Sequence, residues 1–204
     1  MSQSNDKTLQ SYASRLQAYV EGAAPVVGGE VKDWIDSLLA GLKPSASILE
    51  LGSAFGRDAA YIQGRGFTIH CTDAVPGFVA LLRGRGLNAR LLNILTDAPE
   101  RTYDLIFANA VLLHFTRAEF ASALAKLRAA LVPGGRLAFS LKRGRGEEWS
   151  SAKLDAPRYF HYWERQNLPP LLRAAGFASW EIAGTRAGWL FVTADAPCVN
   201  AGPG

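Results

Sequence analysis

The feature that most constrains this chain is the stretch Ile48–Asp58, where an apolar run that carries Glu50 leads into Gly52 and Gly56. A strand, a glycine-containing turn and a helix in this order begin many nucleotide-binding α/β sheets, because glycines let the backbone approach a ligand closely. A second apolar run ends in Asp73, about 20 residues further on, where an acid can bond both hydroxyls of a ribose. The two acids predict a site for a ligand with a ribose and a positive group.

The composition bounds the class of protein. The 204 residues suit one domain, and 49% hydrophobic with 20% charged residues is ordinary for a globular chain. No apolar run reaches the roughly 18 residues of a membrane span, and the N-terminus lacks the basic-then-apolar order of a signal peptide. We therefore expect a soluble, cytoplasmic protein in which Cys71 and Cys198 are free thiols. The sequence does not indicate an oligomeric state.

The positive net charge raises the question of a nucleic-acid partner. The net charge is +4 and the isoelectric point is about 9.2, but the basic residues are spread along the chain. The densest groups, Arg83–Arg85 and Lys142–Arg145, are too short to follow a phosphate backbone. A solvated basic surface is favoured over a nucleic-acid track.

Apolar spacing predicts alternating strands and helices. We expect helices at 8–22, 30–41, 58–63, 77–83, 116–131 and 163–175, with a capping box at Thr116–Glu119. We expect strands at 47–51, 68–72, 89–92, 103–108 and 136–141, Pro133–Gly135 as a turn before the last of these, and a final hairpin at 179–183 and 189–193. This order predicts a doubly wound α/β sheet with helices on both faces. Its ligand would lie at the carboxyl ends of the strands, at Glu50, Asp73, Asn93 and Asn109.

Two cofactor classes compete for that position. A nicotinamide dinucleotide requires G-x-G-x-x-G, so that its pyrophosphate can rest on bare backbone. Here Ala54 stands in place of the second glycine and Arg57 in place of the third. An arginine is too bulky for that close contact between helix and strand, so the dinucleotide is disfavoured.

Five motifs that follow one another along the chain favour a cofactor of a different class from the dinucleotides. They are Glu50-Leu-Gly52-Ser-Ala54-Phe-Gly56, then Asp73, then Asn93, then Tyr103–Phe107, then Leu131–Gly135. This pattern resembles the class I S-adenosylmethionine-dependent methyltransferases, and the resemblance covers about residues 45–195. It implies a Rossmann-like, seven-stranded sheet with the last strand antiparallel, in agreement with the terminal hairpin. It implies one domain, with a helical lid at 1–42, the core at 43–195 and a flexible tail at 196–204.

The resemblance implies S-adenosylmethionine as cofactor and S-adenosylhomocysteine as product. The residues that it assigns to the cofactor are Tyr19, Glu50, Gly52, Ser53, Ala54, Gly56, Arg57, Asp73, Ala74, Asn93, Ile94, Asn109 and Ala110. Glu50 would hold the amino group of the methionine part, Asp73 the ribose and Asn93 the adenine amino group. Ala54 departs from the family's usual central glycine and narrows the approach of the backbone.

Several of these residues have structural alternatives. Glu50 could cap the following turn, Asp73 could cap the helix near Pro76, and Asn93 could serve as a turn residue. Arg57 could reach the cofactor or lie along the sheet edge.

The chemistry asks the protein mainly to hold the acceptor in line with the electrophilic methyl group. A base is needed only for an acceptor that must lose a proton, and His114 after the fourth strand is the candidate for it. The alternative is that His114 packs beside the cofactor, and His70, inside a strand, is expected in the core.

The acceptor pocket is expected at the two ends of the chain. The segment Arg158–Trp163, in the connection before the helix expected at 163–175, offers Tyr159, His161, Tyr162 and Trp163 as walls, although these rings could instead close the core. Tyr12 and Tyr19 share a face of the first helix, where they would form part of a lid or instead pack in the core, with Tyr12 expected at the acceptor. No Asn-Pro-Pro-aromatic motif follows Asn109 and no acids gather there for a metal, so a small-molecule acceptor without metal is favoured. A tRNA or protein acceptor, or a non-catalytic S-adenosylmethionine-binding module, remains an alternative.

Overall fold

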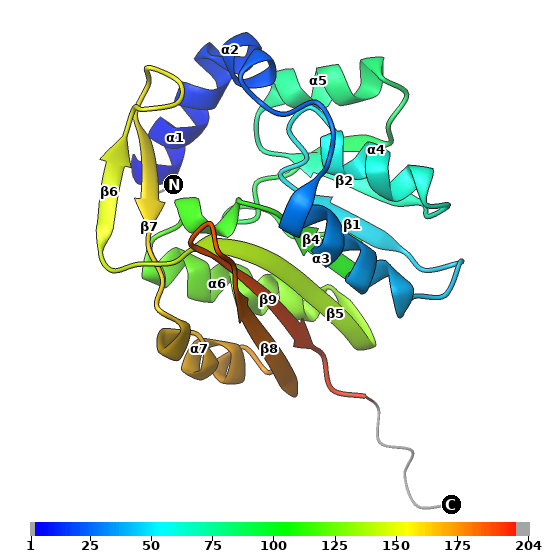
Figure 1. Cartoon of the computed structure of the whole chain (residues 1–204). Coiled ribbons are helices and arrows are strands. Elements are labelled where there is room, and N and C mark those ends of the chain that lie inside the picture. Colours follow the sequence, from blue (N-terminus) through cyan, green and yellow to red (C-terminus); the bar gives the residue numbers. More distant parts are fainter. Residues whose placement is uncertain (1–2, 199–204) are drawn as a thin grey trace, which may run out of the picture.

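The centre of the molecule is one seven-stranded sheet, in a computed structural model that describes residues 3–198 (Figure 1). Its spatial order is β3 (Ala89–Leu91), β2 (Ile69–Asp73), β1 (Ile48–Leu51), β4 (Tyr103–Ala108), β5 (Leu131–Lys142), β9 (Trp189–Asp195) and β8 (Ser179–Gly184). Neighbouring strands from β3 to β5 in this order are parallel, whereas β9 is antiparallel to both of its neighbours, β5 and β8. The predicted doubly wound sheet and its antiparallel last strand are therefore confirmed.

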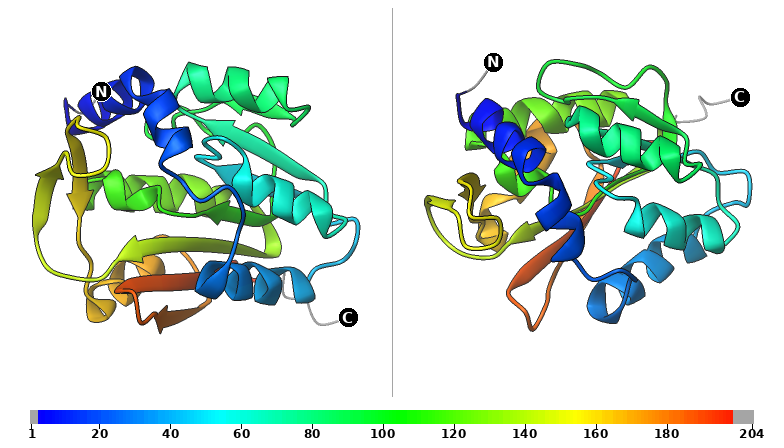
Figure 2. Two further views of the ribbon diagram at one scale, coloured as in Figure 1. Left: turned by 45° about the horizontal axis from the view of Figure 1, so that its top comes forward. Right: turned by 90° about the horizontal axis from the view of Figure 1, so that it is seen from above.

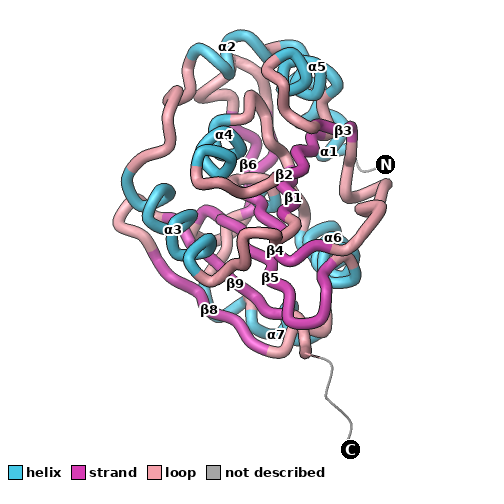
Figure 3. Tube along the Cα trace, turned by 90° about the vertical axis from the view of Figure 1, so that its right-hand side faces the viewer, coloured by secondary structure: helices cyan, strands magenta, loops and turns pink. Residues whose placement is uncertain are grey.

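Helices cover both faces of this sheet, as the end-on view in Figure 3 shows. One face is covered by α3 (Gly29–Ala40), α4 (Arg57–Gly64) and α5 (Pro76–Gly84), which pack on Ile48, Ile69 and Phe107. The other is covered by α6 (Arg117–Ala129) and α7 (Pro169–Ala174). The capping box predicted at Thr116 opens α6. Along the described chain, no helix is both long and apolar enough to cross a bilayer.

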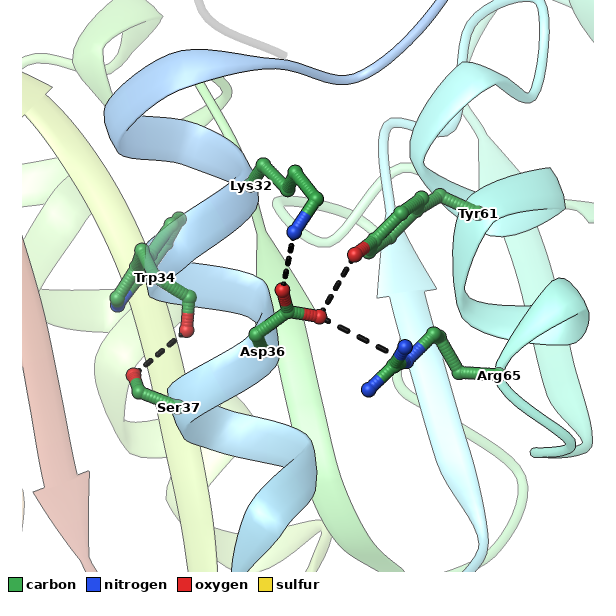
Figure 4. A network of polar contacts seen from close by, with 6 residues as sticks. All are labelled: Lys32, Trp34, Asp36, Ser37, Tyr61 and Arg65. Carbon is green, nitrogen blue, oxygen red and sulfur yellow. Dashed lines mark hydrogen bonds and ion pairs between the residues drawn. The ribbon is translucent and has the colours of Figure 1, made fainter.

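On the first face of the sheet, the carboxylate of Asp36 in α3 connects this helix to α4. Asp36 accepts hydrogen bonds from Lys32 Nζ over 2.6 Å and from the hydroxyl of Tyr61 over 2.7 Å, and Arg65 Nε lies 3.7 Å away (Figure 4). Because Tyr61 and Arg65 belong to α4 and its C-terminal end, the cluster fixes the helix that follows the glycine turn.

Two expected boundaries are wrong. The strand expected at 136–141 begins at Leu131, because Pro133–Gly135 forms an irregularity within β5 rather than a turn before it. The helix expected at 163–175 begins at Pro169, after a short 3-10 turn, η2 (Arg165–Asn167). Trp163 is extended and bridges to Arg143, and Pro169 is tolerated only in the first turn of a helix.

The connection expected before that helix contains a separate β-hairpin. Residues of β6 (Glu147–Ser150) pair antiparallel with β7 (Arg158–His161) and form a two-stranded sheet beside the main one. The N-terminal helices α1 (Gln3–Ser14) and α2 (Leu16–Glu21) replace the single helix expected at 8–22. Figure 2 shows α1 lying against this hairpin, where Thr8 Oγ1 accepts a hydrogen bond from Tyr159 N.

Cys71 is buried and Cys198 exposed, and both are free thiols, as predicted. Residues 199–204 of the expected tail, and residues 1–2 of the expected lid, lie outside the described residues.

Candidate active site

The predicted site residues meet at the carboxyl edge of the sheet. Since β1 pairs with β2 on one side and β4 on the other, Glu50, Asp73 and Asn109 end three adjacent strands. The turn between β1 and α4 passes over this edge and brings Ser53 and Ala54 to the same place.

The β1–α4 turn is folded tightly by three left-handed residues. Gly52, Ala54 and Gly56 have φ angles of +69°, +48° and +82°. A Cβ atom at Gly52 would lie 2.5 Å from Val111 Cγ2, so only glycine fits there. Ala54 tolerates its strained conformation because its N–H donates to Asp73 Oδ2 over 2.9 Å.

Asp73 holds two backbone segments at once. Its Oδ1 accepts from Val75 N over 2.8 Å, at the start of α5, while its Oδ2 accepts from Ala54 N. Asp73 therefore holds the turn before α5 without capping the helix, whose N-cap residue Val75 has no side-chain cap, and each oxygen keeps a lone pair for a further donor. Asp73 is 7% exposed, and burial raises the pKa of its carboxyl group to about 6.

Glu50 is a buried carboxyl group with an unused oxygen. It is 3% exposed, and its Oε2 has no hydrogen-bond partner within the described residues. Burial first, and then the nearby charge of Asp58, raise the pKa of Glu50 to about 8. An orphaned acid of this kind fits a ligand that brings a positive charge, as the sulfonium and ammonium groups of S-adenosylmethionine do.

A chain of hydrogen bonds sets the loop after β4. Asn109 Nδ2 donates to Asp58 Oδ2 over 2.8 Å, and Asn109 Oδ1 accepts from Ser140 Oγ over 2.7 Å. The same Ser140 oxygen accepts from Ala110 N, whose residue has a φ of +58°. Arg57 pairs with Asp58 over 2.7 Å, so it faces the site rather than the outer sheet edge. The sequence offered no signal for Ser140, because its role depends on β5 lying next to β4.

A narrow cavity lies beyond Asp73. Its walls are Asn5, Thr8, Leu9, Leu51, Gly52, Asp73, Ala74, Leu92, Asn93, Ile94, Val111, His114 and Phe115. Asn93 uses its side chain as a turn residue, with Oδ1 accepting from Leu95 N over 3.1 Å, and also donates from Nδ2 to Asn5 Oδ1 over 2.9 Å. The apolar residues Ala74, Ile94 and Phe115 suit the faces of a flat ring.

The helix α1 closes this cavity with polar side chains. Its buried residues are Asn5, Thr8 and Ser11, not the apolar set that its spacing predicted. Ser11 Oγ donates to Pro157 O over 2.6 Å, and Thr8 and Asn5 bond as described above. A helix docked through hydrogen bonds can exchange these partners for water at a small net cost in free energy.

His114 has a partner at each ring nitrogen. Nδ1 lies 2.6 Å from the backbone oxygen of Tyr159, which can only accept, so Nδ1 carries the proton. Nε2 then accepts from the hydroxyl of Tyr12 over 2.9 Å. Burial lowers the pKa of His114 to about 4, so the ring is neutral at pH 7. Of the two possibilities, the geometry favours packing and positioning over proton transfer.

A larger cavity of about 500 Å³ opens next to the β1–α4 turn, and we call it the acceptor cavity. Its lining comes from eight parts of the chain: Tyr19, Gly28, Glu30, Val31, Arg57, Asn109, Ala110, Leu113, His114, Lys142, Ser150, Ala152, Lys153, Arg158, Phe160, Thr185, Ala187, Trp189 and Phe191. It borders the cavity of the turn, with which it shares five lining residues: Tyr19, Arg57, Asn109, Ala110 and Lys153.

The expected acceptor residues of β7 do not line this cavity. Strand alternation turns Arg158 and Phe160 toward it and Tyr159 and His161 away. The hydroxyl of Tyr159 donates to Glu147, and its ring packs edge to face against Trp149, outside the cavity.

The two residues after β7 are also directed elsewhere. Tyr162 donates to Glu148 over 2.5 Å, and Trp163 is 1% exposed, packed on Phe120 in the core. Tyr12 reaches His114 and the ring of Tyr19 rather than the cavity wall. The residues that sequence reasoning missed are Lys142, Lys153, Arg158 and Phe160.

Comparison with known proteins agrees with this geometry. Residues 21–182 match the family model described as a methyltransferase domain, which is most of the chain. No curated protein has a sequence similar enough to match. The chain therefore belongs to the methyltransferase-domain family, and it is a class I S-adenosylmethionine-dependent methyltransferase.

Solved structures share the fold at low sequence identity. The DhpI-SAM-HEP complex has a TM-score of 0.79 at 20% identity, covering 95% of this chain and 99% of that one. The Burkholderia thailandensis 1,6-didemethyltoxoflavin-N1-methyltransferase, with 1,6-didemethyltoxoflavin and S-adenosylhomocysteine bound, has 0.66 at 23% identity, covering 93% and 85%. The [4+2]-cyclase SpnF has 0.69 at 18% identity, covering 95% of both. One fold thus carries more than one chemistry.

Proposed function

We propose that this protein transfers the methyl group of S-adenosylmethionine to a small-molecule acceptor bound in the acceptor cavity. The observation that carries the proposal is the border between this cavity and the cavity of the β1–α4 turn, formed by Tyr19, Arg57, Asn109, Ala110 and Lys153. A volume of about 500 Å³ suits one small molecule. The toxoflavin-type acceptor bound in the Burkholderia enzyme is a small molecule of this kind.

The cofactor would lie along the carboxyl edge of the sheet. Asp73 would accept from the ribose hydroxyls, Glu50 would balance the positive methionine end, and Ala74, Ile94 and Phe115 would enclose the adenine. S-adenosylmethionine supplies a methyl group on a sulfonium: an acceptor lone pair bonds to the methyl carbon as the carbon–sulfur bond breaks, and its electron pair stays on sulfur. The chain's own part is to hold the acceptor in line at near-attack distance.

No lining residue of the acceptor cavity offers a free neutral imidazole as a base. His114 is the one histidine in its lining, and both of its nitrogens are engaged. We assign to His114 the positioning of Tyr12 and hence of α1. An acceptor whose nucleophilic atom needs no deprotonation fits this arrangement best.

Calorimetry with S-adenosylmethionine, followed by incubation of labelled cofactor with a metabolite extract, tests the proposal. We expect micromolar binding and a labelled product in the small-molecule fraction. If S-adenosylmethionine does not bind at high micromolar concentration, the proposed methyltransferase activity is wrong. Binding of the cofactor without any labelled product would indicate a non-catalytic binding module instead. Label in the tRNA or protein fraction would show that the acceptor class is wrong.

A further inference from the structure

The acceptor cavity contains three cationic side chains that no carboxylate neutralises within residues 3–198. They are Lys142, Lys153 and Arg158, none of which lies within 4 Å of an acidic oxygen. The fourth cation of the lining, Arg57, is paired with Asp58. The one acid of the lining, Glu30, accepts from the backbone N–H of Arg186 over 3.1 Å. The cavity therefore has a strong excess of positive charge.

Arg158 is the most informative of the three. It is only 6% exposed, its Nη1 donates to the hydroxyl of Tyr12 over 3.3 Å, and its buried Nε has no partner among the described residues. A buried guanidinium without an anion costs several kcal/mol. Strand alternation places it on the same side of β7 as Phe160, toward the cavity.

The two lysines lie over two different aromatic rings that line the same cavity. Lys142 Nζ lies 4.3 Å from the centre of the Phe160 ring, and Arg158 Cζ lies 5.1 Å from the same point. Lys153 Nζ lies 4.6 Å from the centre of the Tyr19 ring, on the cofactor side of the cavity. Burial, and after it the positive charges of Arg158 and Arg57, lower the pKa of Lys153. An anion between these cations would offset their positive charge.

We propose that the acceptor carries a compact dianionic group of the phosphate or phosphonate class, bound by Arg158, Lys142 and Lys153. That the bound molecule is the methyl acceptor rests on the proposed function. The anion site itself is inferred from these three residues alone. A planar guanidinium donates two parallel hydrogen bonds to tetrahedral oxyanions, and each lysine adds a point charge. The rest of the acceptor would extend toward Asn109 and Ala110, where the cofactor cavity begins.

The test uses methylphosphonate as the probe, at a pH at which it carries two charges, with S-adenosylhomocysteine present. We expect millimolar binding by calorimetry that weakens as salt is raised. Arg158→Gln should weaken it at least about tenfold and Lys142→Met several-fold, since hydrogen bonds to charged groups are involved. Arg90→Gln, which removes an exposed arginine on β3 at the far edge of the sheet, is the matched control and should bind normally.

Three results would overturn the proposal. The first is equal binding of the neutral ester dimethyl methylphosphonate, and the second is equally tight binding of singly charged acetate. The third is unchanged binding in both Lys142→Met and a folded Arg158→Gln, with folding verified by thermal unfolding. Titration of the same proteins with S-adenosylmethionine, in samples without S-adenosylhomocysteine, separates the two proposals, because absence of methylphosphonate binding with retained cofactor binding would contradict only the anion site.

Discussion

The hydroxyl of Tyr12 donates a hydrogen bond to Nε2 of His114 over 2.9 Å, and this bond joins α1 to the loop after β4. Because His114 Nδ1 is fixed by Tyr159 O on β7, the ring connects three segments that surround the site. The histidine therefore links the position of α1 to the geometry of the cofactor cavity.

This arrangement predicts a specific pH dependence of stability. The pKa of His114 is lowered from 6.5 to about 4, so its neutral form stabilises the fold fully above pH 6.5, and that stability is lost as the pH falls toward 4. The effect amounts to about 3 kcal/mol. We expect the wild type, relative to His114→Gln, to lose this difference in the free energy of unfolding between pH 6.5 and 4, measured by urea denaturation. A parallel pH dependence in both proteins would show that the ring is not buried in its neutral form.

A second expectation concerns catalysis. If His114 only positions Tyr12, Tyr12→Phe and His114→Gln should each lower activity, and the double variant should lower it no further than the worse single one. The pH profile of kcat from 6 to 9 should keep its shape in all three. A limb that disappears with His114→Gln alone would identify a proton-transfer role instead.

Glu50 predicts proton release on cofactor binding. With a pKa of about 8 it is mostly protonated at pH 7, and a bound sulfonium and ammonium favour its ionised form. We expect S-adenosylmethionine binding to release about one proton or somewhat less, seen by calorimetry in buffers with different ionisation enthalpies. Glu50→Gln should abolish the buffer dependence. In the free protein, the same raised pKa should make stability fall as the pH rises from 4.5 to 8, and Glu50→Gln should remove that slope.

Asp73 predicts the position of the ribose. Asp73→Asn keeps one acceptor oxygen, whereas Asp73→Ala removes both and also frees Ala54 N. We expect the Kd for S-adenosylmethionine to rise at least about tenfold for Asp73→Asn and more for Asp73→Ala, because charge-assisted hydrogen bonds are lost. Exposed Asp33→Asn is the matched control and should leave the Kd unchanged. Normal binding by a folded Asp73→Ala would place the ribose elsewhere.

The sheet and the cofactor edge were predictable because their signals are local. Glu50, Gly52 and Asp73 sit at fixed offsets within strand-turn-helix units, and parallel pairing then brings strand ends together without further information. The capping box at Thr116 is likewise contained in four residues.

The residues of the acceptor cavity were harder to predict, because their positions depend on strand pairing that leaves no local signal in the sequence. Glu147–Ser150 is mostly exposed and shows no apolar alternation, so β6 exists only by pairing with β7. The aromatic residues after Arg158 were predicted to line the acceptor pocket. Side chains alternate between the two faces of a strand, so that of β7 only Arg158 and Phe160 line the cavity. The hydrophobic pattern did not predict how α1 docks, because its buried residues Asn5 and Thr8 are polar and make hydrogen bonds to the rest of the protein.

The tightness of the β1–α4 turn gives a final prediction. Gly52→Ala puts a Cβ on a residue with a φ of +69° and 2.5 Å from Val111 Cγ2, which should destabilise the fold by about 2–3 kcal/mol. Gly64→Ala is the matched control: Gly64 ends α4, its Cβ would meet nothing within 4 Å, and helix propensity should stabilise by up to about 1 kcal/mol. Chemical denaturation measures both. Because Val111 also lines the cavity beyond Asp73, Gly52→Ala should weaken S-adenosylmethionine binding while Gly64→Ala should not. Equal stability of the two variants would mean that the turn is looser than its backbone angles indicate.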